Sequence, residues 1–267
     1  MPSFPNLISN SVLVNDTIAL LQSSEGPVTA VDIVDNVLKI SSPEPNFAKL
    51  LVSDLIRIDP RLKFSGDTTV EFIPLDFGSR ELHETDFVVF DLETTGAKAP
   101  PCRVTEIGAF RVSGGRIVDE YQTLINPRMP IPAFIAELTG ISDEMVKSAP
   151  EFGEIAEEFL EFVGDAVLVA HNAPFDIRFI NHEIGRVFEG YSLGNPHLCT
   201  VQLSRKLLPD IDNHRLHTVA DYYSIVIENR HRAGDDALAT AKVFVKFLDQ
   251  MQELGVNDIT AAALLKV

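Results

Sequence analysis

The stretch that decides the fold is residues 87–96, which read F-V-V-F-D-L-E-T-T-G. The first four residues are aromatic or β-branched, a run typical of a buried strand. Two acids follow, Asp91 and Glu93, and they point the same way because alternate side chains of a strand share a face. Carboxylates this close repel each other, and a divalent cation with oxygen ligands relieves the repulsion. The stretch therefore predicts a metal-binding strand end, with a solvent-exposed strand end as the alternative.

A second polar block, H-N-A-P-F-D at residues 171–176, directly follows the apolar run 166–170. Polar residues at the end of a buried strand are typical of ligand sites in α/β proteins. Asp176 falls in the first turn of the helix that the pattern predicts next. Stabilisation of that helix start by a carboxylate is the alternative role.

A third block, R-H-R-A-G-D-D at residues 230–236, begins the last long predicted helix. His231 precedes the helix, and Asp236 lies about one turn into it. An imidazole beside a carboxylate suits general-base chemistry near neutral pH. A structural histidine next to a helix-starting acid is the alternative.

Together the three blocks supply four carboxylates and one histidine at strand-to-helix junctions. Two divalent ions bound by such carboxylates activate water and stabilise the leaving oxygen of a phosphodiester. The histidine can accept the proton of that water. The combination indicates metal-dependent phosphodiester hydrolysis.

The three blocks resemble the motifs of the DEDDh 3′→5′ exonucleases, a family of the ribonuclease H-like superfamily that includes the proofreading epsilon subunit of bacterial replicative polymerases. The similarity extends over about residues 86–251. It includes E-I-G-A at 106–109, L-T-G-I-S at 138–142 and A-V-L-V-A-H at 166–171. Within this region the apolar pattern predicts a hairpin over 104–125 with its turn at 113–115, and then alternating helices and strands that include an amphipathic helix over 151–163. That order indicates a mixed sheet with helices on its faces. The resemblance implies the same arrangement, an α/β fold of the ribonuclease H-like type.

The resemblance also implies roles for individual residues and two bound divalent ions, Mg²⁺ or Mn²⁺. The catalytic histidine of the family corresponds to His231, five positions before the last acid. The tyrosine form of the family would need a tyrosine at position 232, where this chain has Arg232. The implied metal ligands, which are also catalytic, are Asp91, Glu93, Asp176 and Asp236.

Further positions are implied to contact the substrate. Thr94, Thr95 and Gly96 follow the first two acids, and Leu138 matches a family element. His171, Asn172 and Phe175 belong to the second block. For Leu138 a place in the core is the alternative. Thr200, Arg205 and Lys206 resemble an element near the substrate strand, with a helix surface as the alternative for the two basic residues. His214 and His217 are interpreted as surface or substrate-proximal residues and not as a zinc site.

Composition narrows the function further. The formal net charge is −17 with a pI of about 4.7, which argues against nucleic-acid binding through a broad basic face. Cys102 and Cys199 form no spacing motif, so a reducing compartment is expected. The first basic residue is Lys39, and no apolar run approaches a membrane span. We expect a cytoplasmic protein without a signal peptide or membrane association.

Before the exonuclease-like region, residues 1–80 predict a small α+β module of three helices and a hairpin. The helices are expected over 11–21, 28–40 and 46 to about 58, with Thr29 or Asp32 as a cap of the second and Asn46 as the cap of the third, and the hairpin over 61–73. That order resembles a winged helix, a class that often binds DNA. Here ten acidic residues against six basic ones favour a module for partner docking or dimerisation instead. The expected division is therefore a winged-helix-like module at 1–80, a linker at 74–85, an exonuclease domain at 86–251 and a tail helix at 252–267. Residues 1–10 are expected to form a loose arm, and the tail helix is left between core packing and a partner surface.

The leading hypothesis is an enzyme that removes nucleoside 5′-monophosphates from the 3′ ends of single-stranded DNA, in proofreading or repair. An exoribonuclease of the same family is one alternative, because discrimination of the 2′-hydroxyl depends on pocket shape. A partner-binding module with secondary nuclease activity is another. The expected protein partner is a polymerase or repair protein that docks on residues 1–80.

Overall fold

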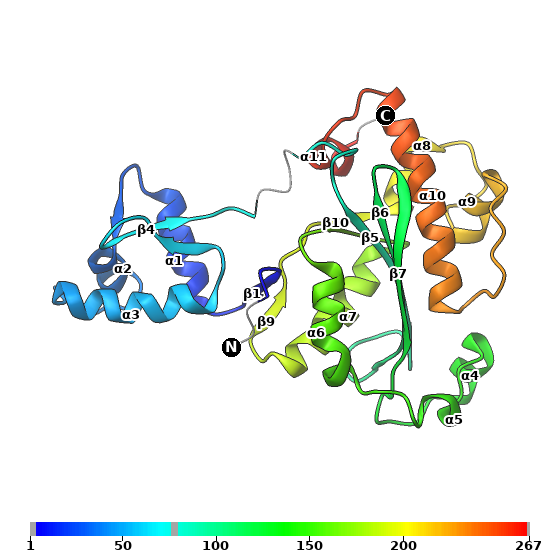
Figure 1. Cartoon of the computed structure of the whole chain (residues 1–267), viewed down its shortest axis with the longest axis horizontal. Helices are drawn as coiled ribbons and strands as arrows, with labels where there is room; N and C mark the ends of the chain where they lie inside the picture. Colours follow the sequence, from blue (N-terminus) through cyan, green and yellow to red (C-terminus); the bar gives the residue numbers. More distant parts are fainter. Residues whose placement is uncertain (1–3, 76–79, 266–267) are drawn as a thin grey trace. The chain divides into compact units, whose positions relative to one another are not determined.

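The computed structural model describes residues 4–75 and 80–265, which form two compact units (Figure 1). The first unit comprises Met1–Leu75 with Phe188–Gly194, and the second comprises Asp76–Val187 with Asn195–Val267. Segment 188–194, which the sequence places in the exonuclease domain, thus belongs to the N-terminal unit. Residues 76–79 of the expected linker lie outside the described residues.

The first unit has three helices followed by a hairpin, in the order that the sequence predicts. Thr29 and Asp32 form a capping box at the second helix, and the Glu44 side chain caps the third, with Pro45 as its first residue. The expected cap Asn46 therefore lies inside that helix. The elements are α1 (Val12–Ser23), β2 (Val28–Thr29), α2 (Ala30–Asn36), α3 (Pro45–Ile58), β3 (Leu62–Phe64) and β4 (Thr69–Phe72).

The sheet of this unit has the order β2-β4-β3, and one apolar core joins it to the helices. The helix expected over 28–40 is shorter, because its first two residues pair with β4 and its last four lie beyond Asn36. The assignment of the unit to the winged-helix class stays a prediction.

The expectation of a loose N-terminal arm is wrong for residues 7–9. They form β1 (Leu7–Ser9), which pairs antiparallel with β9 (Tyr191–Leu193), a strand that the sequence pattern did not reveal. Gly194 follows the pair, and a Cβ there would lie 2.6 Å from a methyl carbon of Ile8. The close approach shows why glycine suits this position.

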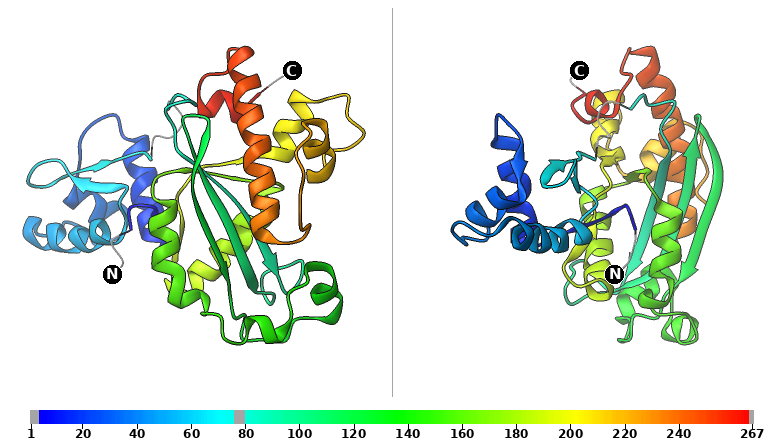
Figure 2. Two further views of the ribbon diagram at one scale, coloured as in Figure 1. Left: turned by 45° about the vertical axis from the view of Figure 1, so that its right-hand side comes forward. Right: turned by 60° about the vertical axis from the view of Figure 1, so that its left-hand side comes forward.

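The second unit contains a five-stranded mixed sheet in the order β10-β8-β5-β6-β7 (Figure 2). Its centre β5 is antiparallel to β6 and parallel to β8, as the pattern of a hairpin followed by helix–strand alternation predicts. The strands are β5 (Phe87–Thr94), β6 (Val104–Ser113), β7 (Arg116–Leu124), β8 (Val167–Ala170) and β10 (His197–Cys199).

Helices cover both faces of this sheet (Figures 1 and 2). On one face α10 packs across β5 and β6, and its Phe244 ring lies 4.8 Å from that of Phe87. The tail helix also packs into this core through Ile259 and Ala262, as the core-packing alternative predicts. The helices are α4 (Ala133–Thr139), α5 (Asp143–Val146), α6 (Phe152–Val163), α7 (Ala173–Val187), α8 (Thr200–Leu207), α9 (Leu216–Tyr222), α10 (Ala233–Glu253) and α11 (Ile259–Ala263).

None of the helices in residues 4–75 and 80–265 combines the length and the apolar character needed to span a membrane.

Candidate active site

The two acids of the deciding stretch lie within β5, which extends beyond the predicted 87–90 because pairing with β6 continues to Thr94. Asp91 stands opposite Gly108 and Glu93 opposite Glu106. Because alternate side chains of a strand share a face, the two acids lie on the same face of β5 as Phe87, which packs against α10. Both carboxylates therefore point toward the side of the sheet that α10 covers.

The second block lies at the end of β8, the strand beside β5. His171 and Asn172 form the turn, with Asn172 in the left-handed region at φ +77°, and α7 begins at Ala173. Asp176, in the first turn of α7, is only 2% exposed. This turn brings Asp176 toward the end of β5, where its charge acts on Asp91.

The third block forms the start of α10. His231 has φ +61°, and its backbone N–H donates a 2.9 Å hydrogen bond to Asp236 Oδ2. Ligand atoms of Glu93, His231 and Asp236 all lie within 4.8 Å of one another. Residues from positions 93, 231 and 236 are thus gathered at one point.

Electrostatics support the grouping of all four carboxylates. Burial, followed by the charges of Asp176, Glu93 and Asp236, raises the pKa of Asp91 well above its ordinary value. Burial and then Asp236 are the leading causes that raise the pKa of Glu93 to about 8. Burial also raises the pKa values of Asp176 and Asp236. The site therefore concentrates negative charge that its own surroundings do not neutralise.

The residues after Glu93 end β5 and begin the loop that leads to β6. Thr94 Oγ1 donates to the Gly96 carbonyl at 2.7 Å, and Thr95 Oγ1 accepts from the Arg103 N–H at 3.0 Å. A Cβ on Gly96 would lie 2.7 Å from Cys102 Sγ, so a larger residue would displace this loop. Thr94 and Thr95 are both buried. Their contact with substrate stays a prediction.

His171 Nδ1 lies 2.9 Å from Thr200 Oγ1, and burial is the main cause that lowers the pKa of His171 to about 4. His171 is therefore neutral at pH 7. It borders an open concavity of about 510 Å³. The lining carries two arginines and no carboxylate: His171, Asn172, Val201, Arg205, Asn213, His214, Arg215 and Leu216.

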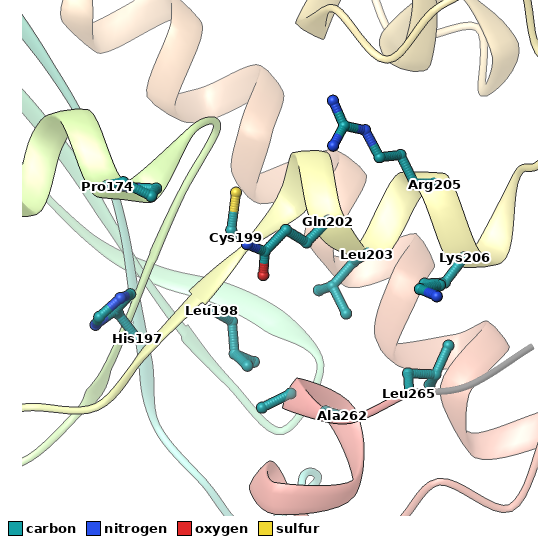
Figure 3. A pocket seen from close by; sticks show the side chains of 11 residues that line it. Pro174, His197, Leu198, Cys199, Gln202, Leu203, Arg205, Lys206, Ala262 and Leu265 are labelled. Carbon is teal, nitrogen blue, oxygen red and sulfur yellow. The ribbon is translucent and has the colours of Figure 1, made fainter.

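The remaining predicted residues are placed as follows. The Phe175 ring packs on Phe179 at 4.8 Å in α7. Leu138, on α4, is 51% exposed, so it is not a core residue. Arg205 and Lys206 border a second cavity of about 280 Å³, between α8 and α11 (Figure 3), and Arg205 lines both cavities. His217 acts on the pKa of His171 through its charge.

Two residues beside the site were missed by sequence reasoning. Glu106 accepts forked hydrogen bonds from Arg232, at 2.5 Å from Nη2 and 3.1 Å from Nε. Glu106 belongs to the E-I-G-A element and Arg232 directly follows His231, so both stand in quoted motifs. The signal was present, but it did not say that positions 126 residues apart would pair.

Comparisons with known proteins identify the family of this chain. The family model RNase_T, described as Exonuclease, matches residues 88–244. DNA polymerase III PolC-type of Caldanaerobacter subterraneus subsp. tengcongensis is 43% identical over 189 residues, 70% of this chain and 13% of that protein. The Bacillus subtilis protein of the same name is 39% identical over 187 residues, 69% of this chain and 13% of its own length. This chain thus spans about an eighth of these relatives.

Solved structures share the fold. Exonuclease X in complex with 5′ overhanging duplex DNA is 25% identical with a TM-score of 0.52, covering 63% of this chain and 93% of that one. Escherichia coli Exonuclease I in complex with a dT13 oligonucleotide is 16% identical with a TM-score of 0.56, covering 64% and 42%, and shows likeness of fold alone. The chain belongs to the exonuclease family, among the DEDDh-type 3′→5′ exonucleases of the ribonuclease H-like superfamily, whose members use divalent metal ions.

Proposed function

We propose that this chain removes nucleoside 5′-monophosphates from the 3′ ends of single-stranded DNA with the help of Mg²⁺ or Mn²⁺. The observation that carries the proposal is the convergence of Glu93, His231 and Asp236 within 4.8 Å, with Asp91 and Asp176 acting electrostatically on the same group. Four acids and one histidine from three distant segments match the chemistry that the motifs indicate.

The donor set suits hard divalent cations. All four candidate ligands carry carboxylate oxygens, which Mg²⁺ and Mn²⁺ prefer. Their raised pKa values show the cost of gathering these charges, and bound cations would offset it. Asp91, Glu93, Asp176 and Asp236 would hold two ions, which supply charge stabilisation for the phosphodiester and lower the pKa of the attacking water.

His231 would act as the general base. Its side chain is exposed, and its backbone is held by Asp236, so the imidazole is available to the attacking water. In this mechanism His231 takes a proton from water, the water oxygen bonds to the terminal phosphorus, and the bond to the 3′ oxygen of the preceding nucleotide breaks. The products are a nucleoside 5′-monophosphate and a strand one nucleotide shorter.

The substrate strand would follow the concavity beside His171. Arg205 and Arg215 line it without an opposing acid, which suits phosphate on a chain of net charge −17. The terminal nucleotides would contact residues 94–96, Leu138, Asn172 and Phe175. DNA is favoured over RNA because the relatives are DNA polymerases by name and Exonuclease X was solved with DNA.

The N-terminal unit would serve as a docking module for a polymerase or repair protein, and the enzyme would work in the cytoplasm. The surplus of acidic residues in the N-terminal unit favours a protein partner over DNA. A pull-down with the full chain, compared with a chain lacking residues 1–75, tests this role. Equal capture of such partners by both chains would overturn it.

Single-stranded DNA and RNA oligonucleotides, each labelled at the 5′ end, test the catalytic proposal. With Mg²⁺ or Mn²⁺ we expect a ladder that shortens from the 3′ end, faster on DNA. EDTA and the Asp91→Ala variant should both abolish it. Faster degradation of RNA would overturn the substrate assignment, and no degradation with either metal would overturn the enzymatic proposal.

A further inference from the structure

Glu106 is a fifth acid at the site, and it differs from the other four. It lies directly opposite Glu93 on the neighbouring strand β6 and is 7% exposed. Its charge adds to the repulsion on Asp91 and Glu93. A buried carboxylate beside four others is costly, so its presence calls for a function that offsets the cost.

The oxygens of Glu106 are already occupied by the start of α10. Arg232 donates from Nε and Nη2 in the forked arrangement that suits a carboxylate, and the Ala233 backbone N–H donates to Oε2 at 2.9 Å. Arg232 itself provides no side-chain cap for α10. Glu106 therefore supplies from the sheet the acceptor that a capping residue would otherwise supply.

The backbone of this helix start lies against the sheet. A Cβ on Gly108, two residues after Glu106, would lie 2.3 Å from the Ala233 carbonyl oxygen. A Cβ on Gly234 would lie 2.3 Å from Gln122 Oε1 on the next strand. Two glycines thus permit the close approach that brings Glu106 within reach of Ala233.

The clamped residues lie between His231 and Asp236. His231 adopts φ +61°, a conformation that non-glycine residues rarely keep unless their surroundings hold it. The body of α10 is anchored by Phe244 and Phe247 in the core, whereas His231 precedes the helix and is exposed. Apart from the hydrogen bond of its backbone N–H to Asp236, the position of His231 therefore depends on what holds Arg232 and Ala233.

We infer that the Glu106–Arg232 pair is a positioning clamp for His231, and that Glu106 is not a metal ligand. The inference rests on the proposed function, in which His231 is the general base. Misplacing a catalytic group by about 1 Å costs on the order of 100-fold in rate. The clamp should therefore affect kcat much more than KM.

The test compares Glu106→Gln, Arg232→Lys and Arg232→Met in the full chain on single-stranded DNA. We expect Glu106→Gln and Arg232→Met each to lower kcat by about 10- to 100-fold with KM changed less than about 3-fold. Arg232→Lys, which keeps the charge but loses the fork, should recover part of the rate. The double variant should be no slower than the slower single, because the pair acts as a unit.

Two further measurements separate positioning from other roles. In a His231→Ala background, Glu106→Gln should change kcat less than about 2-fold. Calorimetric titration of the Glu106→Gln variant with Mn²⁺, without substrate, should show a Mn²⁺ affinity within about 3-fold of that of the unsubstituted chain. Asp59→Asn, which breaks a buried forked pair in the other unit, is the matched control for lost stability and should keep kcat.

The outcomes are distinct. A full effect of Glu106→Gln in the His231→Ala background, or a tenfold loss of Mn²⁺ affinity, would overturn the clamp and assign Glu106 to the metal site. Unchanged kcat in an active enzyme would overturn the clamp alone. An unsubstituted chain without activity would overturn the proposed function instead.

Discussion

Two buried carboxylates, Asp59 of the first unit and Asp176 of the second, have opposite surroundings. In the first unit, the side chain of Asp59 is fully buried, but it accepts a forked pair of hydrogen bonds from Arg61 at 2.9 and 2.8 Å and a third from the Ser9 N–H at 2.8 Å. In the second unit, Asp176 is as well buried, but its charged neighbours include Asp91, another acid. The charge of Asp59 is therefore neutralised by Arg61, whereas Asp176 and that neighbouring acid have no such arginine partner among the described residues.

The difference separates a structural acid from a functional one. A buried charge with a complete set of partners stabilises the arrangement around it, and its removal leaves the partners unpaired. A group of like charges without partners destabilises the fold and persists where it binds a ligand. The same substitution, aspartate to asparagine, should therefore have opposite effects in the two units.

The largest expected effect is on turnover at Asp91. Asp91→Asn should lower kcat by about 1,000-fold or more, because it removes a candidate metal ligand. It should also raise the melting temperature of the metal-free protein, because one of four mutually repelling charges is lost. Exonuclease assays and thermal unfolding in EDTA check both parts. Near-full activity would remove Asp91 from the metal site.

The next effect is at His231. His231→Ala should lower kcat by about 100- to 10,000-fold, the range for a lost general base. Divalent metal affinity should change little, since the carboxylates remain. Rapid-quench kinetics and Mn²⁺ titration check this prediction, and a rate close to that of the unsubstituted chain would show that another group accepts the proton.

In the first unit the effect should fall on stability. Asp59→Asn should lower the free energy of unfolding by about 3–5 kcal/mol, because the mostly buried Arg61 loses its partner. Turnover by the folded protein should be unchanged. Urea unfolding measures the first and exonuclease assays the second.

The exposed Asp54–Arg57 pair provides the control, and Asp54→Asn should cost less than about 1 kcal/mol. Equal losses in the two variants would contradict the structural role of Asp59.

The smallest effect is a pH dependence of the metal-free protein. Glu93 has a pKa of about 8 in the folded state against an ordinary 4.5, so the folded state binds the proton more tightly. Stability from this group is present below pH 4.5 and is lost as the pH rises toward 8. Melting temperatures in EDTA should show a decline across this range that Glu93→Gln reduces. A decline of equal size in the variant would assign it to other groups.

Much of the second unit was predictable because its signals are local. The apolar run at 87–90, the hairpin around Gly114 and the apolar stripe of α6 each depend on neighbours in sequence, and the structure confirms all three. The end of β5 was not predictable in this way. Its extension through Thr94 comes from pairing with β6, which polar residues such as Asp91 and Glu93 do not signal.

The first unit shows the same limit. Of the two caps expected for the second helix, Thr29 is the N-cap and Asp32 completes the capping box, which is a local pattern. The pairing of Leu7–Ser9 with Tyr191–Leu193 was missed, because strands of three residues carry too little periodicity and their partner lies far away in the chain.

The sequence by itself determined the family, the order of the elements and the acids and histidine of the candidate site. It could do so because metal chemistry needs particular side chains, and these stand in short motifs. Only the tertiary structure decided which charges are neutralised by which groups. Asp59 pairs with Arg61, and Glu106 pairs with Arg232. Among the described residues, the four carboxylates of the candidate site accept no hydrogen bond from either of these arginines. Distance, burial and direction set those pairings, and they exist only once the chain has folded.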